Sequence, residues 1–354
     1  MAYATISKPS LHFNTKLYTG TGSSNAITGV GFQPDWTWIK VRSNGTYGHA
    51  LFDSVRGVNK PIQSNSTSAE GNDASGSYTS LNSFDSDGFT LGGYYNKVNQ
   101  SGQTFVSWNW KASGSTASNT DGSITSTVSA NTTAGFSIVT YTGTGSTTTV
   151  GHGLGVKPEI VIYKERNNTN SWRVMTDLDG GTLKRIYLNV NDAATSIIDS
   201  STAPTSTVLN IGTGSEINRD SNATYVAYCF ASIKGFSKFG TYTGNGNDDG
   251  TFVYTGFKPE FVMVKAFSGA DSWQMTDHPR DANVSPNFAR LLANATSAES
   301  TNTTWAKIEK FSNGFKLRGT DGVSNQNGRT FLFMAYAEEP LVANVGASIP
   351  ATAR

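Results

Sequence analysis

The sequence predicts an all-β protein of three tandem antiparallel β-sandwich domains, with a jelly-roll-like arrangement as the alternative. Three observations indicate this fold. A Tyr-Thr-Gly-x-Gly motif begins at Tyr18, Tyr141 and Tyr242. Each copy is followed by Gly-x-x-Pro-acid with an apolar run, and later by a run of alternating large apolar residues. The copies start roughly 100 residues apart, which suits domains that each bury a core better than a short solenoid repeat.

The apolar run after each proline predicts a central strand. The three runs are 36–40, 160–164 and 261–265, and each ends on a lysine. Both faces of these runs are largely apolar, as expected of strands that are covered on both sides. The proline stands at the start of the strand, where its missing N–H is not needed for pairing.

The closing runs predict a second core strand in each repeat. They span 104–110, 224–230 and 330–336, and their alternation places three large side chains on one face. The chain has one cysteine, so no intrachain disulfide is expected. This residue, Cys229, falls among the small residues of the opposite face, where we expect it to be buried.

Shorter signals fill in the rest of each repeat. Asp87-Gly88 and Asn313-Gly314 are the residue pairs that form tight hairpins. Residues 285–294 are compatible with a helix or with a strand that has a bent start, because 184–189 hold the matching place in the second repeat.

The repeats define the expected domain boundaries. Residues 113–122 carry no large apolar side chain and predict a flexible linker, whereas 232–236 leave almost no linker between the second and third repeats. We therefore expect the first domain to be coupled more loosely than the other two. The predicted units are 1–112 with a short docking segment from Ala2 to His12, the 113–122 linker, 123–234, 235–340 and a 341–354 tail.

Charge and hydropathy exclude several classes of function. The chain has 27 basic and 26 acidic residues without a run of one sign, so we expect neither nucleic-acid binding nor a membrane-surface helix. No apolar stretch approaches the roughly 20 residues that span a bilayer, so no membrane insertion is expected. The N-terminus shows no signal peptide, which predicts synthesis and folding in a cytoplasm.

No metal site and no cofactor are predicted. Residues 245–250 have the alternating oxygen side chains of a calcium loop, but Gly256 stands where a bidentate Glu is required. An ordinary turn is therefore favoured, with a weak cation site as the alternative. The histidines lack the spacing of a zinc site; they are His12, His49, His152 and His278.

No catalytic residue is predicted either. Asp53, Asp177 and Asp277 occur at comparable places in the three repeats, which favours a structural role over the paired carboxylates of a glycosidase. No Gly-x-Ser-x-Gly nucleophile motif is present for a histidine to serve.

Two tryptophans are candidates for ligand contact. Trp172 and Trp273 each follow a serine at the start of a strand. The sequence favours core packing for both, with stacking on a sugar ring as the alternative. The tryptophans of the first repeat are predicted to fill the core of that domain; they are Trp36, Trp38, Trp108 and Trp110.

The first repeat resembles an uncharacterised β-rich repeat family common in tailed bacteriophages of marine bacteria and cyanobacteria. The segments that carry the resemblance are 13–20, 31–40, 53–57 and 84–92, and the end of the chain, 349–354, is also similar. The second and third repeats lack the Asp-Ser-Val-Arg-Gly segment of 53–57. The resemblance implies a virion protein and supplies no catalytic residues.

The function expected from these observations is that of a virion structural protein, not an enzyme. A tail fibre or comparable receptor-binding appendage is the leading hypothesis. Head decoration or a head fibre is the second, a tail adaptor the third, and a glycan-degrading enzyme the last. The expected partners are other virion proteins, bound through the N-terminal segment, and a host surface glycan or protein receptor. A homotrimer is expected, with an exposed tip at loops 267–272 and 320–328.

Overall fold

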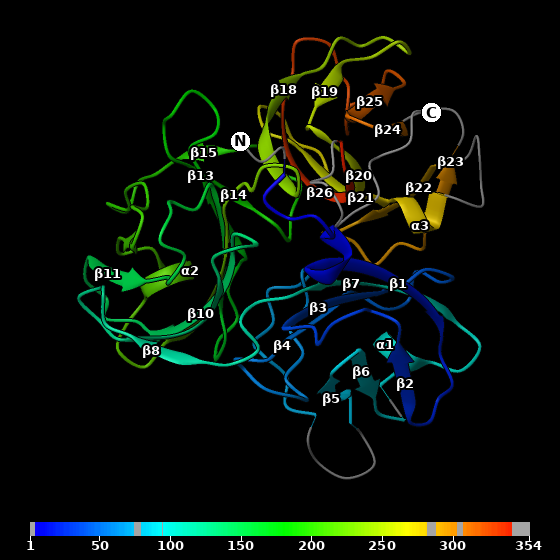
Figure 1. The fold of residues 1–354 in the computed structure, drawn as a ribbon. Helices are drawn as coiled ribbons and strands as arrows, with labels where there is room; N and C mark the ends of the chain where they lie inside the picture. Colours follow the sequence, from blue (N-terminus) through cyan, green and yellow to red (C-terminus); the bar gives the residue numbers. More distant parts are fainter. Residues whose placement is uncertain (1–3, 74–78, 94, 282–287, 303–306, 342–354) are drawn as a thin grey trace.

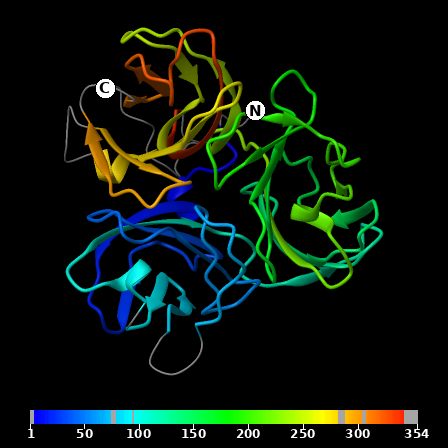
Figure 2. The same cartoon turned by 180° about the vertical axis from the view of Figure 1, so that it is seen from behind.

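The computed structural model describes residues 4–73, 79–93, 95–281, 288–302 and 307–341, and within them the chain is all-β. The three repeats form three lobes that meet around a common centre (Figure 1), and the same arrangement is seen from behind (Figure 2). Each lobe is a sandwich of a large inner sheet and a small outer sheet. No helix among the described residues has the length and apolar character that crossing a membrane would require.

In the first lobe, the inner sheet has the order β1-β7-β3-β4 and the outer sheet β2-β6-β5. All pairs are antiparallel. The elements are η1 (Pro9–Leu11), β1 (Phe13–Thr19), β2 (Asn25–Thr28), β3 (Trp36–Val41), β4 (Ala50–Asp53), β5 (Leu81–Asp85), β6 (Gly88–Leu91), α1 (Asn96–Asn99) and β7 (Thr104–Trp110).

The second lobe has the longest sheet, in the order β15-β14-β13-β12-β17-β10-β9-β8, with β11-β16 as its outer sheet. The elements are β8 (Ala117–Asn119), β9 (Ser126–Asn131), β10 (Phe136–Thr142), β11 (Thr148–Gly151), β12 (Ile160–Glu165), β13 (Arg173–Thr176), β14 (Lys184–Tyr187), β15 (Thr195–Ser196), β16 (Val208–Ile211), α2 (Ser215–Asn218) and β17 (Thr224–Phe230).

In the third lobe, the inner sheet has the order β18-β26-β20-β21-β22-β23 and the outer sheet β19-β25-β24. The elements are β18 (Ser237–Thr243), β19 (Phe252–Tyr254), β20 (Phe257–Ala266), β21 (Trp273–Asp277), α3 (His278–Asp281), β22 (Phe288–Leu292), β23 (Ser300–Asn302), β24 (Lys307–Phe311), β25 (Gly314–Arg318) and β26 (Thr330–Pro340).

The predicted central strands are covered on both faces. The outer sheet of the same lobe covers one face, and the other two lobes cover the other. In β3, Ile39 faces the outer sheet of its own lobe, whereas Trp36 and Trp38 face the common centre. The same division holds in β12 and β20, and in the closing strands β7, β17 and β26. The expectation of three domains in a row, each with a complete core of its own, is therefore wrong, because the largest aromatic side chains fill a core that all three lobes share.

Aromatic contacts join the lobes pairwise at this centre. The rings of Trp36 and Tyr228 stack with centroids 4.4 Å apart, which joins the first and second lobes. The rings of Phe13 and Tyr336 stack at 4.8 Å, which joins the first and third. Phe230 and Phe239 meet edge to face at 6.1 Å, which joins the second and third. These distances are typical of aromatic pairs that stabilise a core beyond their burial.

Three hydrogen bonds from aromatic N–H groups also link the lobes in a ring. The second lobe donates to the first, the third donates to the second, and the first donates to the third. Trp38 donates its indole N–H to Nδ1 of His49 at 2.8 Å, so the proton of this imidazole is on Nε2. Burial lowers the pKa of His49 to about 3, which keeps it neutral. The three bonds run from Trp172 Nε1 to Gln63 O at 2.8 Å, from Trp273 Nε1 to Tyr187 O at 2.9 Å, and from His49 Nε2 to Leu292 O at 3.0 Å.

The lysine that ends each central strand is buried and bonds to backbone carbonyls. Lys164 donates to Glu165 O and Asn170 O in its own lobe and to Thr67 O in the first. Lys265 donates equivalently within the third lobe and to Asn191 O in the second. Burial lowers the pKa of these lysines, and of Lys40, to about 8. Their recurrence in the sequence thus has a structural cause.

The Tyr-Thr-Gly-x-Gly motif is held by a buried asparagine that the sequence analysis did not identify. Asn99 accepts the N–H of Thr21 at 2.9 Å and donates to Ser23 O and Gly92 O. The first glycine cannot be replaced, because a Cβ on Gly20 would lie 2.2 Å from a backbone oxygen. Asn218 and Asn325 make the same three kinds of bond in the other lobes.

Residues 113–122 are not a flexible linker. Residues Ala117–Asn119 form β8, which pairs with β9 at the edge of the second inner sheet. Asp35 accepts the N–H groups of Ala112 at 2.7 Å and Gly114 at 3.1 Å, which ties the start of this segment to the first lobe. This segment is therefore bonded to both the first and the second lobe and does not couple them loosely, contrary to expectation.

The N-terminal segment lies on the body of the protein. Ala4, Ile6 and Pro9 are buried, and Ile6 belongs to the shared core. The N–H of Thr5 donates to Lys234 O at 3.0 Å. The described part of the expected docking segment is thus a packed element of the fold. Residues 1–3 and the tail residues 342–354 lie outside the described residues.

Several local expectations are confirmed. The hairpins at Asp87-Gly88 and Asn313-Gly314 join β5 to β6 and β24 to β25. Residues 288–292 form a strand, β22, and not a helix. Cys229 is buried, and burial raises the pKa of its thiol to about 12. The loop 267–272 is not an exposed tip throughout, because Phe267 is buried in the shared core.

Glu260, the acid after the third proline, gives the fold a pH dependence. It is buried between the first and third lobes and accepts the N–H of Thr15 at 2.6 Å. Burial, assisted by the nearby Asp277 and Glu338, raises its pKa from 4.5 to about 8. The folded protein therefore holds this proton up to about pH 8, whereas the unfolded chain releases it near pH 4.5.

The contribution of Glu260 to stability is present below about pH 4.5 and is lost as the pH rises toward 8. We expect the free energy of unfolding to fall by about 2 kcal/mol or more from this group over that range, since one pKa unit corresponds to about 1.4 kcal/mol. Thermal unfolding of Glu260→Gln at pH 5, 6.5 and 8 should show a flatter pH profile. Glu159→Gln, at the same position of the second repeat, is the control. A profile of Glu260→Gln that parallels the unmodified protein would contradict this assignment.

Candidate functional site

Two of the three aspartates singled out in the sequence, Asp53 and Asp277, lie at interfaces between lobes, whereas Asp177 pairs with Lys157 of its own lobe. Asp53 lies opposite Trp36 in the strand register, and Asp277 lies opposite Phe261 at the same place in the third lobe. In the second lobe this place is held by Thr176, not by Asp177, so the expected equivalence was one residue off.

Asp53 and Asp277 each begin a chain of ion pairs that crosses to the next lobe. Asp277 pairs with Arg280, whose Nη1 lies 3.1 Å from Oε2 of Glu299. Glu299 then binds both Nε and Nη2 of Arg42 in the first lobe. The corresponding chain between the first and second lobes runs through Asp53, Arg56, Glu70 and Arg166.

Each carboxylate in these two chains is paired with at least one arginine. Burial raises the pKa of Glu299 and of Glu70, but the guanidinium groups that bond to them outweigh burial and leave both pKa values below the usual value. Each aspartate also accepts a bond from the neighbouring lobe. Tyr228 donates its hydroxyl to Asp53 at 2.7 Å, and Trp108 donates its indole N–H to Asp277 at 2.9 Å.

Between the second and third lobes, the described residues form no corresponding chain of ion pairs. The backbone bond of this interface, from Ala194 N to Phe267 O at 2.9 Å, matches those from Glu70 to Arg166 and from Glu299 to Arg42. Ala194 and Phe267 therefore replace the glutamate and the second arginine. Thr176 replaces the aspartate, and Phe267 is buried in the shared core. Apolar packing thus takes the place of ionic contact here.

Trp172 and Trp273 are core residues. Both are fully buried, and their indole N–H groups are bonded to the neighbouring lobe. Core packing is confirmed, and neither ring presents a face to a ligand. The alternative of sugar stacking at these two residues is therefore wrong.

The turn at 245–250 is held by its own side chains and by cationic neighbours. Oδ1 of Asn245 accepts the N–H of Asn247 at 3.0 Å, and Oδ1 of Asn247 accepts the N–H of Asp249 at 2.9 Å. Asp249 pairs with Lys316 and Arg318, so its charge is already balanced. An ordinary turn is the better interpretation. Within the described ranges, no group of three or more His, Cys, Asp or Glu side chains is arranged to hold a metal ion.

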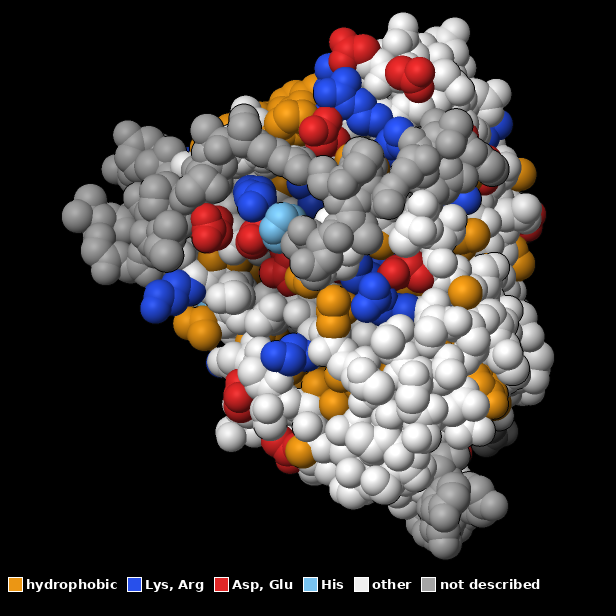
Figure 3. Space-filling model, turned by 90° about the vertical axis from the view of Figure 1, so that its right-hand side faces the viewer, with side chains coloured by type: hydrophobic (Ala, Val, Ile, Leu, Met, Phe, Trp, Pro, Cys, Tyr) orange, Lys and Arg blue, Asp and Glu red, His pale blue; other side chains and the backbone are white. Residues whose placement is uncertain are grey.

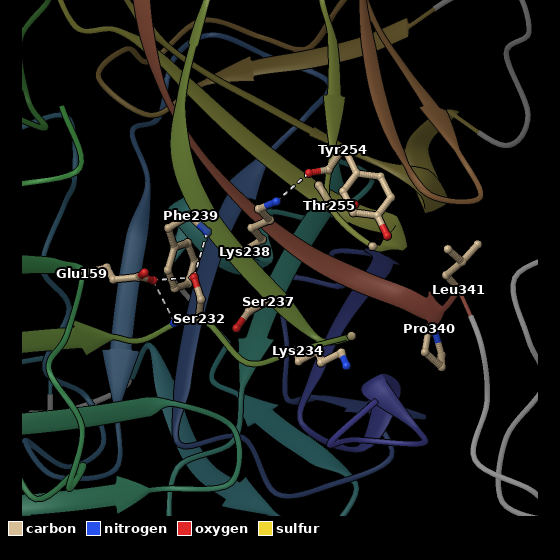
Figure 4. Close-up of a pocket in the computed structure, with 12 residues that line it drawn as sticks. Glu159, Ser232, Lys234, Ser237, Lys238, Phe239, Tyr254, Thr255, Pro340 and Leu341 are labelled. Carbon is tan, nitrogen blue, oxygen red and sulfur yellow. Dashed lines mark hydrogen bonds between the residues drawn. The ribbon is translucent and has the colours of Figure 1, made fainter. Parts of the chain in front are cut away.

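A groove at the junction of the second and third lobes is the candidate site (Figure 4). Its volume is about 610 Å³. It lies beside β18 and the end of β19, the edge strands of the inner and outer sheets of the third lobe. A smaller hollow of about 280 Å³ continues it along the same two strands, past Gly240 and Phe252.

Two aromatic side chains stand exposed along this groove. Tyr254 is 54% exposed and Phe252 is 43% exposed. They flank the buried Val253 on β19, so both point to the outer side of the sheet. Lys238 of β18 donates its ammonium to Tyr254 O at 2.8 Å and lies 5.4 Å from the centre of the Tyr254 ring.

Polar groups surround these rings. In Figure 4, Tyr254 extends from β19 into the open space, with Lys238 on one side and Pro340 and Leu341 on the other. At the far end of the groove, Oε2 of Glu159 accepts the N–H of Ser232 at 2.9 Å and the Ser232 hydroxyl. Its other carboxylate oxygen and the Tyr254 hydroxyl make no hydrogen bond to any residue that the structure describes. Both remain available to a ligand.

The groove is a property of the third lobe. Val253 matches Ile27 and Val150 in the register of the outer sheets. The place of Tyr254 is therefore held by Thr28 and Gly151 in the other lobes, and that of Phe252 by Ala26 and Thr149. On the inner sheet, Gly240 stands where Lys16 and Val139 stand.

The edge of the second lobe that corresponds to this groove is also closed by backbone. Strand β9 pairs with β10 along residues 127–131, whereas β18, like β1 of the first lobe, has a neighbour on one side only among the described strands. The third lobe therefore combines an open edge with two exposed aromatic rings. Such a site can bind a flat, partly apolar ligand and hydrogen-bond to its polar rim.

The charges of the groove are mixed in sign. On the face shown in Figure 3, which is the right-hand side of Figure 1, Lys and Arg side chains are likewise interspersed with Asp and Glu. The groove itself contains Glu159, Lys234 and Lys238. This balance suits a ligand without a large net charge.

A family model for a domain of unknown function (DUF7483) matches residues 8–340 of the chain. The match spans all three lobes, in agreement with their shared core. No curated protein matches the chain, and no solved structure matches it.

Proposed function

Starting from a chain that belongs to the DUF7483 family over residues 8–340, we propose that it is a non-enzymatic structural protein of a tailed-bacteriophage virion. Its role is that of a tail fibre or comparable receptor-binding appendage that mediates host attachment. The site of action is the virion, after synthesis in the host cytoplasm. Other virion proteins and a host surface receptor are its partners.

One observation carries this proposal. The polar residues that recur between the lobes are used in bonds that hold the lobes together, such as Asp277, Lys265 and Asn325. The third lobe departs from the repeat at an open groove, where the exposed Tyr254 stands in place of Thr28 and Gly151. A rigid scaffold with one distinctive surface is the organisation expected of a binding protein.

The shape of the protein favours head decoration as the second candidate. The three lobes form a compact ring and not an elongated row, whereas a fibre shaft is long (Figure 1). The ring also offers an alternative to the expected homotrimer, because one chain already supplies three equivalent lobes. We propose that a single chain of 37.7 kDa acts as one such unit, which light scattering of the purified protein would test.

The location in the particle is tested with purified virions. We expect mass spectrometry of CsCl-banded particles to detect the protein and immunogold labelling to mark the tail. Copy number separates the two candidates, because a decoration protein approaches the copy number of the major capsid protein and a tail appendage is far less abundant. Absence of the protein from particles that retain infectivity would refute both.

Activity on host cells is the second part of the test. The purified protein should adsorb to host cells and slow phage adsorption, and it should release no reducing sugar from host polysaccharide. Release of sugar would return the glycan-degrading enzyme as the correct class.

A further inference from the structure

We propose that the groove beside β18 and β19 is a saccharide-binding site in which the Tyr254 ring stacks on a pyranose ring. This inference rests on the proposed attachment function and names the ligand class and the residues of its site. The ligand is a neutral or zwitterionic glycan, such as a surface polysaccharide presents.

The exposed aromatic rings are the first reason to expect a saccharide. A pyranose has a flat face of C–H groups that packs on an aromatic ring, and the rings used in this way must be accessible. Among the large apolar side chains that the structure describes, Tyr254 is 54% exposed and lies in a groove, together with the half-exposed Phe252. Thr28 and Ala26 hold the same places in the first lobe, and of the two rings Phe252 also meets Phe311 edge to face at 6.2 Å.

The polar groups at the rim of the groove are the second reason to expect a saccharide. A sugar presents hydroxyl groups at the edges of its ring, each of which can donate and accept a hydrogen bond. The groove offers the ammonium of Lys238 as a donor, the carboxylate of Glu159 as an acceptor, and the Tyr254 hydroxyl as both. The cavity of about 610 Å³ is within the range of small-molecule sites.

Two other occupants are less favoured. A peptide strand could pair with the open edge of β18, but Lys238 on that edge is the type of residue that discourages strand addition. The chain's own tail, residues 342–354, follows Leu341 at the rim of the groove. Both occupants predict results that differ from those of a saccharide site.

The test uses the full chain and a panel of defined saccharides. Saturation-transfer-difference NMR with glucose, galactose, mannose, N-acetylglucosamine, N-acetylgalactosamine and their common disaccharides should detect binding of at least one sugar. The affinity should then be measured by titration calorimetry. We expect Tyr254→Thr, which installs the residue of the first repeat, to weaken binding at least tenfold, and Tyr254→Phe to remain within about threefold of the unmodified protein.

A matched control separates stacking from folding. Thr28→Ala changes the same register position of the first lobe and should leave both the melting temperature and saccharide binding unchanged. Tyr254→Thr should also melt within about 2 °C of the unmodified protein, because its ring is half exposed.

Each alternative result overturns the proposal. These results are no binding across the panel, binding that Tyr254→Thr leaves intact, and binding that appears only after residues 342–354 are deleted, which would identify the tail as the occupant. Detection of the protein in virions without saccharide binding would refute the site and leave the attachment function standing. Saccharide binding by a protein that is absent from virions would do the reverse.

Discussion

A fragment that ends at residue 112 will not fold as a monomer. The first lobe would expose the rings that fill the shared core, among them Phe13, Trp36 and Trp110. Trp36 alone packs within 4.4 Å of Trp110 and of Tyr228 in the second lobe, measured between ring centroids. A domain of this size can fold alone when its core is its own, but exposure of several large rings removes a large share of the apolar burial of this one.

Calorimetry of the full chain and NMR of the fragment check this expectation. The full chain should unfold in a single transition, with a calorimetric enthalpy equal to the van't Hoff enthalpy. The fragment should give a poorly dispersed amide spectrum, or should fold only on self-association into a ring of three. A monomeric fragment with a cooperative melting transition would contradict the shared core, as would three separate transitions in the full chain.

Replacement of Asp277 by alanine is expected to lower the free energy of unfolding by about 3–5 kcal/mol, the range seen when one partner of a buried ion pair is removed. The change leaves the buried Arg280 guanidinium without its nearest carboxylate and the Trp108 indole N–H without an acceptor. Unfolding in urea, monitored by tryptophan fluorescence, measures the loss. The matched control is Thr176→Ala in the second lobe, where no such chain exists, and its cost should be about 1 kcal/mol or less.

A double substitution tests whether the chain acts as a unit. Arg42→Phe with Glu299→Ala installs in one interface the residues that the other interface already has, Phe267 and Ala194. The two changes together should cost less than the sum of the single changes by about 1–3 kcal/mol, because each alone leaves an unpaired charge. Additive costs for Arg42→Phe and Glu299→Ala would show that the charges act independently.

Much of the fold could be predicted from the sequence because alternation reports burial. The runs at 36–40, 160–164 and 261–265 form buried strands, as their two apolar faces indicated. What covers the second face could not be predicted, because an apolar face carries no information on whether its partner is a sheet of the same domain or a neighbouring lobe. The residues 113–122 show the converse, since a strand can form at a sheet edge without large side chains.

The interfaces were missed for a different reason. Asp277 and Arg280 repeat the spacing of Asp53 and Arg56, but His278 and Pro279 between them obscure the match to Asp-Ser-Val-Arg. His49 takes the place of Trp172 and Trp273 in the contacts between lobes. Counting residues from the lysine that ends each central strand does not reveal this match, because the loop after that lysine is one residue longer in the first repeat. Strand register, which only the structure supplies, resolves both cases.

The groove beside β18 and β19 was not predicted at all. The sequence around Phe252 and Tyr254 alternates like any strand, and an exposed aromatic residue has the same pattern as a buried one. The available signal was a comparison between the repeats. Only in the third is the buried apolar residue of this strand, Val253, preceded and followed by an aromatic residue. Trp172 and Trp273 were candidates because a tryptophan ring at the start of a strand can stack on a sugar, yet this position does not distinguish a ligand platform from an interior residue.

The closure of the three lobes within one polypeptide has a consequence for how the molecule can change. In an assembly of identical subunits, every substitution occurs at three places at once, so a charged contact cannot be exchanged in one junction and retained in the others. Covalent fusion removes that constraint. The junction containing Phe267 and the exposed aromatic pair of β19 are departures that a fused ring permits, since each occurs at one of three otherwise corresponding places.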